Sequence, residues 1–198
     1  MSDDAELPGG RCLRLRPWTD SDLGLMVALN TPEMTAHVGG PESDERVRQR
    51  LRSYISEPGE GRDDAGAMFV IEVTGTGRAR GPVAAGENRE RPGTAAGSIG
   101  FWPLRWAGQP ICETGWAVLP AYQGLGVAST AARLVVAKAA AARLAPTLHA
   151  FPAVDHPASN AVCRRSGFRL IGPAEFEYPK GHLMQVNDWS IALENLRS

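Results

Sequence analysis

The sequence predicts a mixed α/β domain, and three observations support this. The chain has 198 residues, which suits a single domain, and 43% of them are hydrophobic, enough for a sizeable core. Along the chain, segments with the apolar–polar alternation of strands are interleaved with segments that have helical periodicity. Glycine and proline mark the boundaries between them. We therefore expect a flexible segment over residues 1–10 and one domain over residues 11–198.

The first third of the domain predicts one strand and two helices. Residues 13–17 alternate leucine with arginine, which favours a strand. Thr19 or Asp20 can cap the helix that follows, and Ser43 can cap a second helix after a loop. The apolar stripe of that second helix consists of Val47, Leu51, Tyr54 and Ile55.

The middle of the chain predicts three strands. Residues 68–74 form the first, and residues 96–104 and 110–119 form a hairpin. The connection over residues 75–95 is rich in glycine, arginine, proline and glutamate, which predicts a mobile loop. Its arginines either meet an acidic partner or simply lie in solvent; they are Arg78, Arg80, Arg89 and Arg91.

The last third continues the alternation of helices and strands. An alanine-rich helix over residues 126–144 stops at Pro146 and is followed by a short strand. A helix over residues 157–166 follows, and Gly167 is well placed to end it. Two further strands, over residues 168–172 and 184–193, complete the sheet.

Composition excludes several classes of function. The formal net charge of −1 predicts neither nucleic-acid binding nor attachment to an anionic membrane. The three cysteines lie far apart, without the spacing of a metal site or a disulfide framework, as is typical of a reducing cytoplasm. No apolar run is long enough to cross a membrane, and the acidic first residues do not resemble a secretory signal. We expect a cytoplasmic protein without a metal.

The most informative segment is the glycine-rich turn between the second hairpin strand and the alanine-rich helix. Backbone N–H groups at a helix N-terminus favour phosphate, because they lack intrahelical partners and the helix dipole adds positive potential. A nucleotide-binding Walker loop is excluded, since no Gly-Lys is followed by Ser or Thr. The dinucleotide fingerprint also fails, because Ser129 occupies the place of its third glycine.

The residues of this turn resemble a known family. The run Gln123-Gly-Leu-Gly126-Val-Ala128 matches the acetyl-CoA motif of the GNAT acetyltransferases, Gln/Arg-x-x-Gly-x-Gly/Ala. Residues 113–124 resemble the RimJ/RimL-like branch, as do 13–18, 30–40, 156–159 and 165–168. The resemblance implies a twisted, mostly antiparallel sheet that is split between two central strands and flanked by helices.

The resemblance also implies a site for acetyl-CoA. The backbone of Ala117, Val118 and Leu119 should contact the pantetheine arm, and the turn should hold the pyrophosphate. The turn residues are Gln123, Gly124, Leu125, Gly126, Val127 and Ala128, with Ser129 or Thr130 adding a hydroxyl. The 3′-phosphate needs a cation, for which Arg133, Arg164 and Arg165 are candidates, although each can equally be a solvated surface residue.

Acetyl transfer to an amine needs a base and an acid. Glu113 is the candidate base, because strand alternation places it on one face with Gly115, where a partly apolar cleft should raise its pKa. Many family members use a tyrosine as the acid, but none lies between residues 150 and 168. Ser159 takes that role by resemblance, or else caps the helix. By resemblance both Ser159 and His156 belong to the cofactor site. His156 replaces the family's asparagine, so it either donates a hydrogen bond to the cofactor or is a solvent-facing residue at the start of the helix.

The acceptor cleft is less well defined. By resemblance it is flanked by the loop over residues 34–40 and by the aromatic hairpin. Candidate contacts are Met34, His37, Trp102 and Trp106. The acceptor is a primary amine, either a protein N-terminal α-amine or a small molecule, and direct transfer in a ternary complex is expected because no residue suggests a covalent carrier. A homodimer is compatible with the sequence. The alternatives are a non-catalytic CoA-binding sensor and another phosphate-binding α/β domain.

Overall fold

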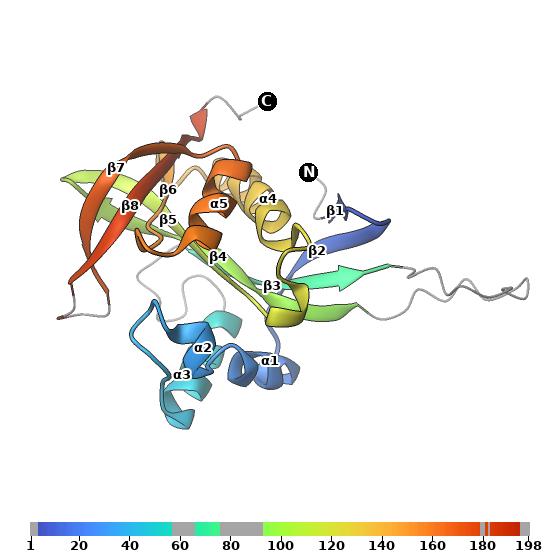
Figure 1. Ribbon diagram of the computed structural model, residues 1–198. Coiled ribbons are helices and arrows are strands. Elements are labelled where there is room, and N and C mark those ends of the chain that lie inside the picture. Colours follow the sequence, from blue (N-terminus) through green and yellow to red (C-terminus); the bar gives the residue numbers. More distant parts are fainter. Residues whose placement is uncertain (1–3, 57–65, 76–92, 179–180, 182, 195–198) are drawn as a thin grey trace, which may run out of the picture.

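The structure is a computed structural model that describes residues 4–56, 66–75, 93–178, 181 and 183–194. Within these residues, eight strands form one sheet in the order β1-β2-β3-β4-β5-β6-β8-β7 (Figure 1). Neighbouring strands are antiparallel except β5 and β6, which are parallel. The strands are β1 (Asp4–Leu7), β2 (Arg11–Pro17), β3 (Ala67–Thr74), β4 (Thr94–Trp106), β5 (Gln109–Val118), β6 (Thr147–Ala150), β7 (Arg169–Glu177) and β8 (Leu183–Ala192).

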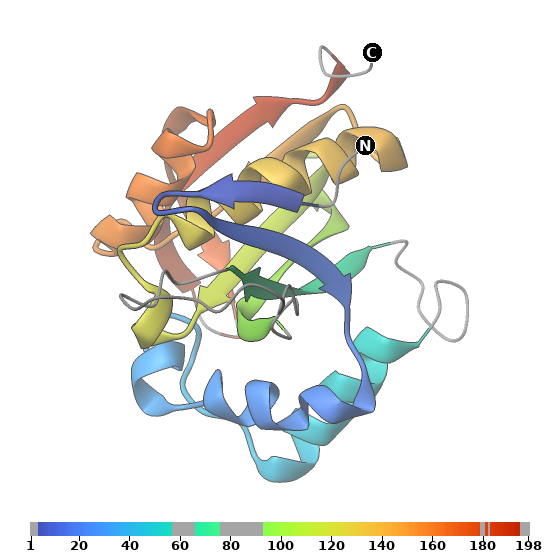
Figure 2. The ribbon, with the colours of Figure 1, turned by 90° about the vertical axis from the view of Figure 1, so that its right-hand side faces the viewer.

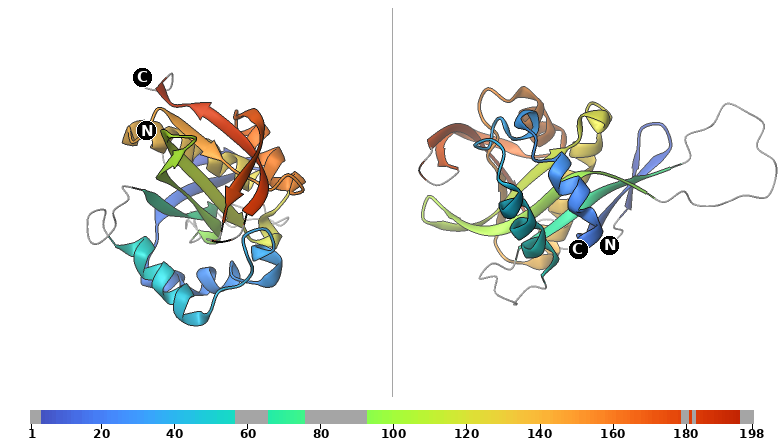
Figure 3. Two further views of the ribbon diagram at one scale, coloured as in Figure 1. Left: turned by 90° about the vertical axis from the view of Figure 1, so that its left-hand side faces the viewer. Right: turned by 90° about the horizontal axis from the view of Figure 1, so that it is seen from below.

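Helices cover both faces of the sheet. On one face lie α4 (Val127–Ala142) and α5 (Pro157–Arg165), and on the other lie α1 (Leu23–Ala28), α2 (Pro32–Thr35) and α3 (Asp44–Ile55) (Figure 1). Viewed from below, the second layer lies in front of the sheet (Figure 3). The larger core packs under α4, and a smaller one, which includes Trp18, Val47 and Leu51, packs beneath α1 and α3. None of the described helices has the length and apolar character that crossing a membrane requires.

Local capping signals explain where two helices begin and end. Ser43 caps α3 as predicted, because its hydroxyl accepts the backbone N–H of Arg46 at 3.4 Å. Gly167 has a φ of 90° after α5. Its N–H donates to the carbonyl of Arg164 at 3.4 Å, and the N–H of Phe168 donates to that of Cys163 at 3.1 Å. This is the paired hydrogen bonding of a glycine-ended helix, as the sequence predicts.

Two expectations need correction. Residues 4–7, assigned to a flexible segment, form β1 and pair with β2, and Leu7 is 2% exposed. Gly9 and Gly10, with φ of 87° and 73°, close this hairpin, and its first strand is too short to show periodicity. The predicted mobile loop extends too far, because residues 94–95 belong to β4. Residues 76–92, with Arg78, Arg80, Arg89 and Arg91, lie outside the described residues.

The β4–β5 hairpin fixes the register at the centre of the sheet. Its turn consists of Ala107 and Gly108, which have φ of 47° and 77°. Positive φ at both turn positions is typical of the tight turn that suits the right-handed twist of paired strands. This register sets Trp102 opposite Glu113 and Gly97 opposite Val118.

The sheet is split between β5 and β6, as the resemblance implies. The two parallel strands pair only at Cys112 with Leu148 and at Glu113 with His149. Strand β5 continues to Val118, so residues 114–118 have no strand partner on the β6 side within the described ranges. Glu113 therefore lies at the last paired position, where the split begins.

Candidate active site

The glycine-rich turn leads from β5 into α4 without a side-chain cap. Gly124 and Gly126 both adopt positive φ, at 71° and 80°, and Gly126 is the N-cap of α4. The Gln123 amide donates to the carbonyl of Val118 at 2.9 Å, so this side chain ties the turn to the end of β5. The hydroxyl of Ser129 donates to the carbonyl of Gly126 at 3.2 Å. Among the described residues, the backbone N–H groups at the start of this 16-residue helix thus have no side-chain acceptor.

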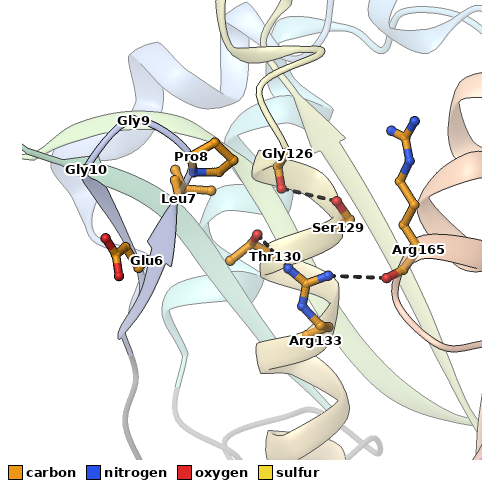
Figure 4. Close-up of a pocket in the computed structure, with 10 residues that line it drawn as sticks. All are labelled: Glu6, Leu7, Pro8, Gly9, Gly10, Gly126, Ser129, Thr130, Arg133 and Arg165. Carbon is orange, nitrogen blue, oxygen red and sulfur yellow. Dashed lines mark hydrogen bonds between the residues drawn. The ribbon is translucent and has the colours of Figure 1, made fainter.

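A pocket of about 710 Å³ opens beside the start of α4 (Figure 4). It is lined by Glu6, Leu7, Pro8, Gly9, Gly10, Gly126, Ser129, Thr130, Arg133 and Arg165. The β1–β2 hairpin, which contributes half of this lining, lies against α4 (Figure 2). Because the sequence pattern predicted no strand before residue 10, this wall of the pocket could not be predicted from it.

Two of the three candidate arginines line the pocket, and Arg164 does not. The guanidinium of Arg133 donates to the hydroxyl of Thr130 at 3.0 Å and to the carbonyl of Arg165 at 3.2 Å. Figure 4 shows Arg133 and Arg165 on neighbouring helices at one side of the pocket. Two cations and a hydroxyl near an uncapped helix N-terminus favour a phosphorylated ligand.

Glu113 lies on the opposite face of the sheet from α4. The indole N–H of Trp102, its cross-strand partner, donates to Oε2 of Glu113 at 2.9 Å. Burial raises the pKa of Glu113 to about 7, and the hydrogen bond from Trp102 opposes this shift. The predicted rise in this pKa is therefore present, and a carboxyl that titrates near neutral pH suits proton transfer at that pH.

A buried polar network lies next to Glu113 in the sheet. His149, its partner on β6, is 8% exposed, and its Nδ1 lies 2.7 Å from Oδ1 of Asp188. Oδ2 of Asp188 accepts the indole N–H of Trp106 at 3.0 Å. The ring of Trp106 also packs against Phe151, with centroids 4.8 Å apart. Trp106 was predicted to contact the acceptor, and in the structure its polar atom bonds to Asp188.

Three predicted residues, His37, His156 and Ser159, lie at the connection between β6 and α5 or against it. The rings of His37 and His156 stack with centroids 4.2 Å apart, and burial lowers the pKa of His156. Ser159 lies partly exposed in the first turn of α5, where its hydroxyl bonds to no residue that the structure describes. Met34 is partly buried in α2. The His37–His156 contact joins the α2–α3 connection to the β6–α5 connection.

Asn160 holds this connection in place, although nothing in the sequence pattern suggested it. Its amide nitrogen donates to the carbonyls of Ala153 and His156, both at 2.9 Å. Its amide oxygen accepts from Asn187 at 2.8 Å and from Trp189 at 2.9 Å. The side chain, 7% exposed, thereby ties the start of α5 to β8.

Replacing Asn160 with alanine should lower the free energy of unfolding by about 2–4 kcal/mol, because buried donors and acceptors lose their partners. Urea denaturation followed by fluorescence measures this loss. Asn30→Ala is the matched control, since the Asn30 side chain bonds, among the described residues, to the backbone of Glu42 alone. A loss at Asn160 no greater than at Asn30 would contradict the role we assign to it.

Comparison with known proteins places the chain in a family. Residues 12–169 match the family described as acetyltransferase (GNAT) domain. A search of the curated proteins found no match. Among solved structures, the chain is similar to RimL, the ribosomal L7/L12 α-N-protein acetyltransferase, in complex with coenzyme A. The identity is 19%, the TM-score 0.66, and the alignment covers 96% of this chain and 97% of that one.

Two further solved structures are similar. One is the microcin C7 self-immunity acetyltransferase MccE with acetyl-CoA and AMP, at 14% identity, TM-score 0.67 and 97% coverage of each chain. The other is spermidine N-acetyltransferase from Vibrio cholerae with CoA and spermine, at 17% identity, TM-score 0.67, and 94% and 98% coverage. These likenesses agree on the fold, and the family match covers most of the sequence. The chain belongs to the GNAT acetyltransferase family.

Proposed function

We propose that this protein transfers an acetyl group from acetyl-CoA to a primary amine while both substrates are bound. The observation that carries the proposal is the position of Glu113. It lies where the β5–β6 pairing ends, on the strand that leads into the glycine-rich turn. One strand thus presents both a carboxyl suited to proton transfer and the start of an anion site. Similar structures hold CoA or acetyl-CoA, which supports this donor.

The residues of the donor site fit acetyl-CoA. The N–H groups at the start of α4 and the positive φ of Gly124 and Gly126 suit a pyrophosphate. The unpaired edge of residues 114–118 on β5 leaves backbone groups for an extended amide-containing arm. Acetyl-CoA supplies an activated acyl group as a thioester. Arg133 and Arg165 are the candidates for its 3′-phosphate.

The pKa of Glu113 favours an α-amine over a lysine side chain as acceptor. An α-amine titrates at about 7.7–8.0 and a lysine at about 10.4. With Glu113 near 7, moving the proton from an α-ammonium to the carboxylate costs about 1 kcal/mol, against about 4.6 kcal/mol from lysine. The acceptor nitrogen then bonds to the acetyl carbon as the carbon–sulfur bond breaks. Ser159, whose hydroxyl has no partner in the described part of the chain, is our candidate to protonate the sulfur.

The test pairs calorimetric titration of acetyl-CoA with a thiol-release assay over a panel of acceptors. The panel contains peptides with free α-amines, the same peptides with blocked N-termini and an internal lysine, and polyamines. We expect acetyl-CoA to bind and thiol to be released only with a free amine, with products one acetyl group heavier. Binding without thiol release on any amine would identify a CoA sensor instead. Equal binding of ATP and CoA would contradict a donor site that is specific for CoA.

The two pocket arginines give a prediction for the donor. Arg165→Gln should weaken CoA binding by about three- to tenfold, because a charge-assisted contact to phosphate is lost near the surface. The variant should lose little affinity for 3′-dephospho-CoA, which lacks that group. Arg164→Gln is the matched control, since Arg164 neighbours Arg165 but does not line the pocket. Equal losses for both ligands, or for both variants, would remove Arg165 from the site.

A further inference from the structure

Two tryptophans on β4 make the same kind of contact. Trp102 and Trp106 are four positions apart, so they share one face of the strand. Trp102 donates its indole N–H to Oε2 of Glu113 at 2.9 Å, and Trp106 donates to Oδ2 of Asp188 at 3.0 Å. Each indole therefore holds one oxygen of a carboxyl group.

The two carboxyl groups differ at their second oxygen. Oδ1 of Asp188 lies 2.7 Å from Nδ1 of His149, so both of its oxygens have partners. Oε1 of Glu113 makes no hydrogen bond to any residue in the described ranges. Both oxygens of Asp188 thus have a hydrogen-bond partner, whereas Glu113 has one oxygen held and, among the described residues, one without a partner.

Close packing limits the movement of the Trp102 indole away from Oε2 of Glu113. A Cβ atom placed on Gly115 would lie 3.1 Å from Cη2 of Trp102. The ring thus lies directly over Gly115, where a side chain would crowd it. A Cβ on Gly66 would lie 2.8 Å from Cβ of Trp102, so the Gly66 backbone packs closely against the base of this side chain. The ring therefore lies over Gly115, and its N–H is directed at Oε2 of Glu113.

We propose that Trp102 is a positioning residue that holds Oε2 of Glu113 and leaves Oε1 as the atom that takes the proton of the acceptor amine. The inference rests on the proposed function. In the transfer, the N–H proton moves to Oε1, a nitrogen–carbon bond forms, and the carbon–sulfur bond breaks. Glu113 later returns its proton to solvent. An indole N–H only donates, so it favours the ionised carboxylate and opposes rotation of the free oxygen away from the cleft.

Among the described residues, no charged side chain takes the place of Trp102 beside the Glu113 carboxyl. The causes of the pKa shift of Glu113 are burial, which raises it, and the Trp102 hydrogen bond, which lowers it. His149, the cross-strand partner of Glu113 on β6, pairs with Asp188. No charged side chain contributes to the Glu113 shift within the described chain.

The test follows the Glu113 carboxyl directly by ¹³C NMR titration, with Glu113→Gln identifying the resonance. Trp102→Phe removes the donor and keeps a ring, and we expect the pKa of Glu113 to rise by about half to one unit. Trp106→Phe is the matched control and should leave this titration unchanged. A pKa that stays constant or falls in Trp102→Phe, or that moves equally in Trp106→Phe, would overturn the proposal.

A second readout needs no variant of the indole. In the wild type, the Nε1–H resonance of Trp102 should shift with pH at the pKa of Glu113, and in Glu113→Gln this titration should disappear. A Trp102 resonance that does not change with the protonation state of Glu113 would overturn the proposal, even if Trp102→Phe fails to fold. Neither titration depends on turnover, so an absence of acetyl transfer would count against the proposed function alone.

Discussion

Replacing Glu113 with glutamine is expected to lower kcat by at least tenfold, and on the usual scale for a lost general base by about 10²–10⁴-fold. Glutamine keeps the size of the side chain and can still accept the Trp102 N–H, but it cannot take a proton from the acceptor. Steady-state kinetics with the best amine of the panel measures the loss. The dissociation constant for acetyl-CoA should change little, because the glycine-rich turn lies beyond the end of β5.

Stability provides the control for this variant. Burial raises the pKa of Glu113 from 4.5 to about 7 in the folded protein. The stabilising contribution of the protonated group is complete below about 4.5 and is lost as pH rises through about 7, a change of about 3 kcal/mol. Glutamine stays neutral throughout, so Glu113→Gln should be at least as stable as the wild type at pH 8. A lower melting temperature would mean that the activity loss reflects unfolding.

Replacing Gly97 with alanine is expected to have the largest effect on stability, lowering the free energy of unfolding by about 3 kcal/mol or more. Gly97 lies opposite Val118 in the β4–β5 pair. A Cβ there would lie 2.2 Å from the carbonyl oxygen of Ala117 and 3.0 Å from Cα of Val118. Both are backbone atoms of a paired strand, so relief requires the strands to separate just before the glycine-rich turn. Chemical denaturation measures the loss.

Gly24→Ala is the matched control for this substitution. Gly24 lies in α1, and a Cβ there would meet no atom within 4 Å. Alanine is the better helix former by up to about 1 kcal/mol, so this variant should be neutral or slightly more stable. Equal effects at Gly97 and Gly24 would show that the close approach of β4 and β5 is not the cause.

The parts of the fold that were predictable depend on local signals. Ser43 and Gly167 mark helix boundaries because capping involves residues close in sequence. Strand β1 was missed because four residues carry no usable period, and its anchor is the single buried residue Leu7. The order of the strands depends on contacts between distant segments, which the sequence pattern does not encode.

In the candidate site, too, some contacts follow from local signals and others depend on segments that are distant in sequence. The resemblance pointed to Glu113 and the glycine-rich turn, but it assigned Trp102 to the acceptor. The tight turn at residues 107–108 fixes the register that sets Trp102 opposite Glu113, so this contact was within reach of the sequence. The contact between His149 and Asp188 was not, because it joins β6 to β8 across 39 residues.

The pH dependence of kcat, measured with both substrates saturating, tests the role of Glu113 most directly. With an α-amine acceptor, the wild-type rate should rise with pH through an apparent pKa near 7, as the carboxyl ionises. In Glu113→Gln that step should be absent and the residual rate should follow the amine alone. The same step in both proteins would contradict the assignment of Glu113 as the base.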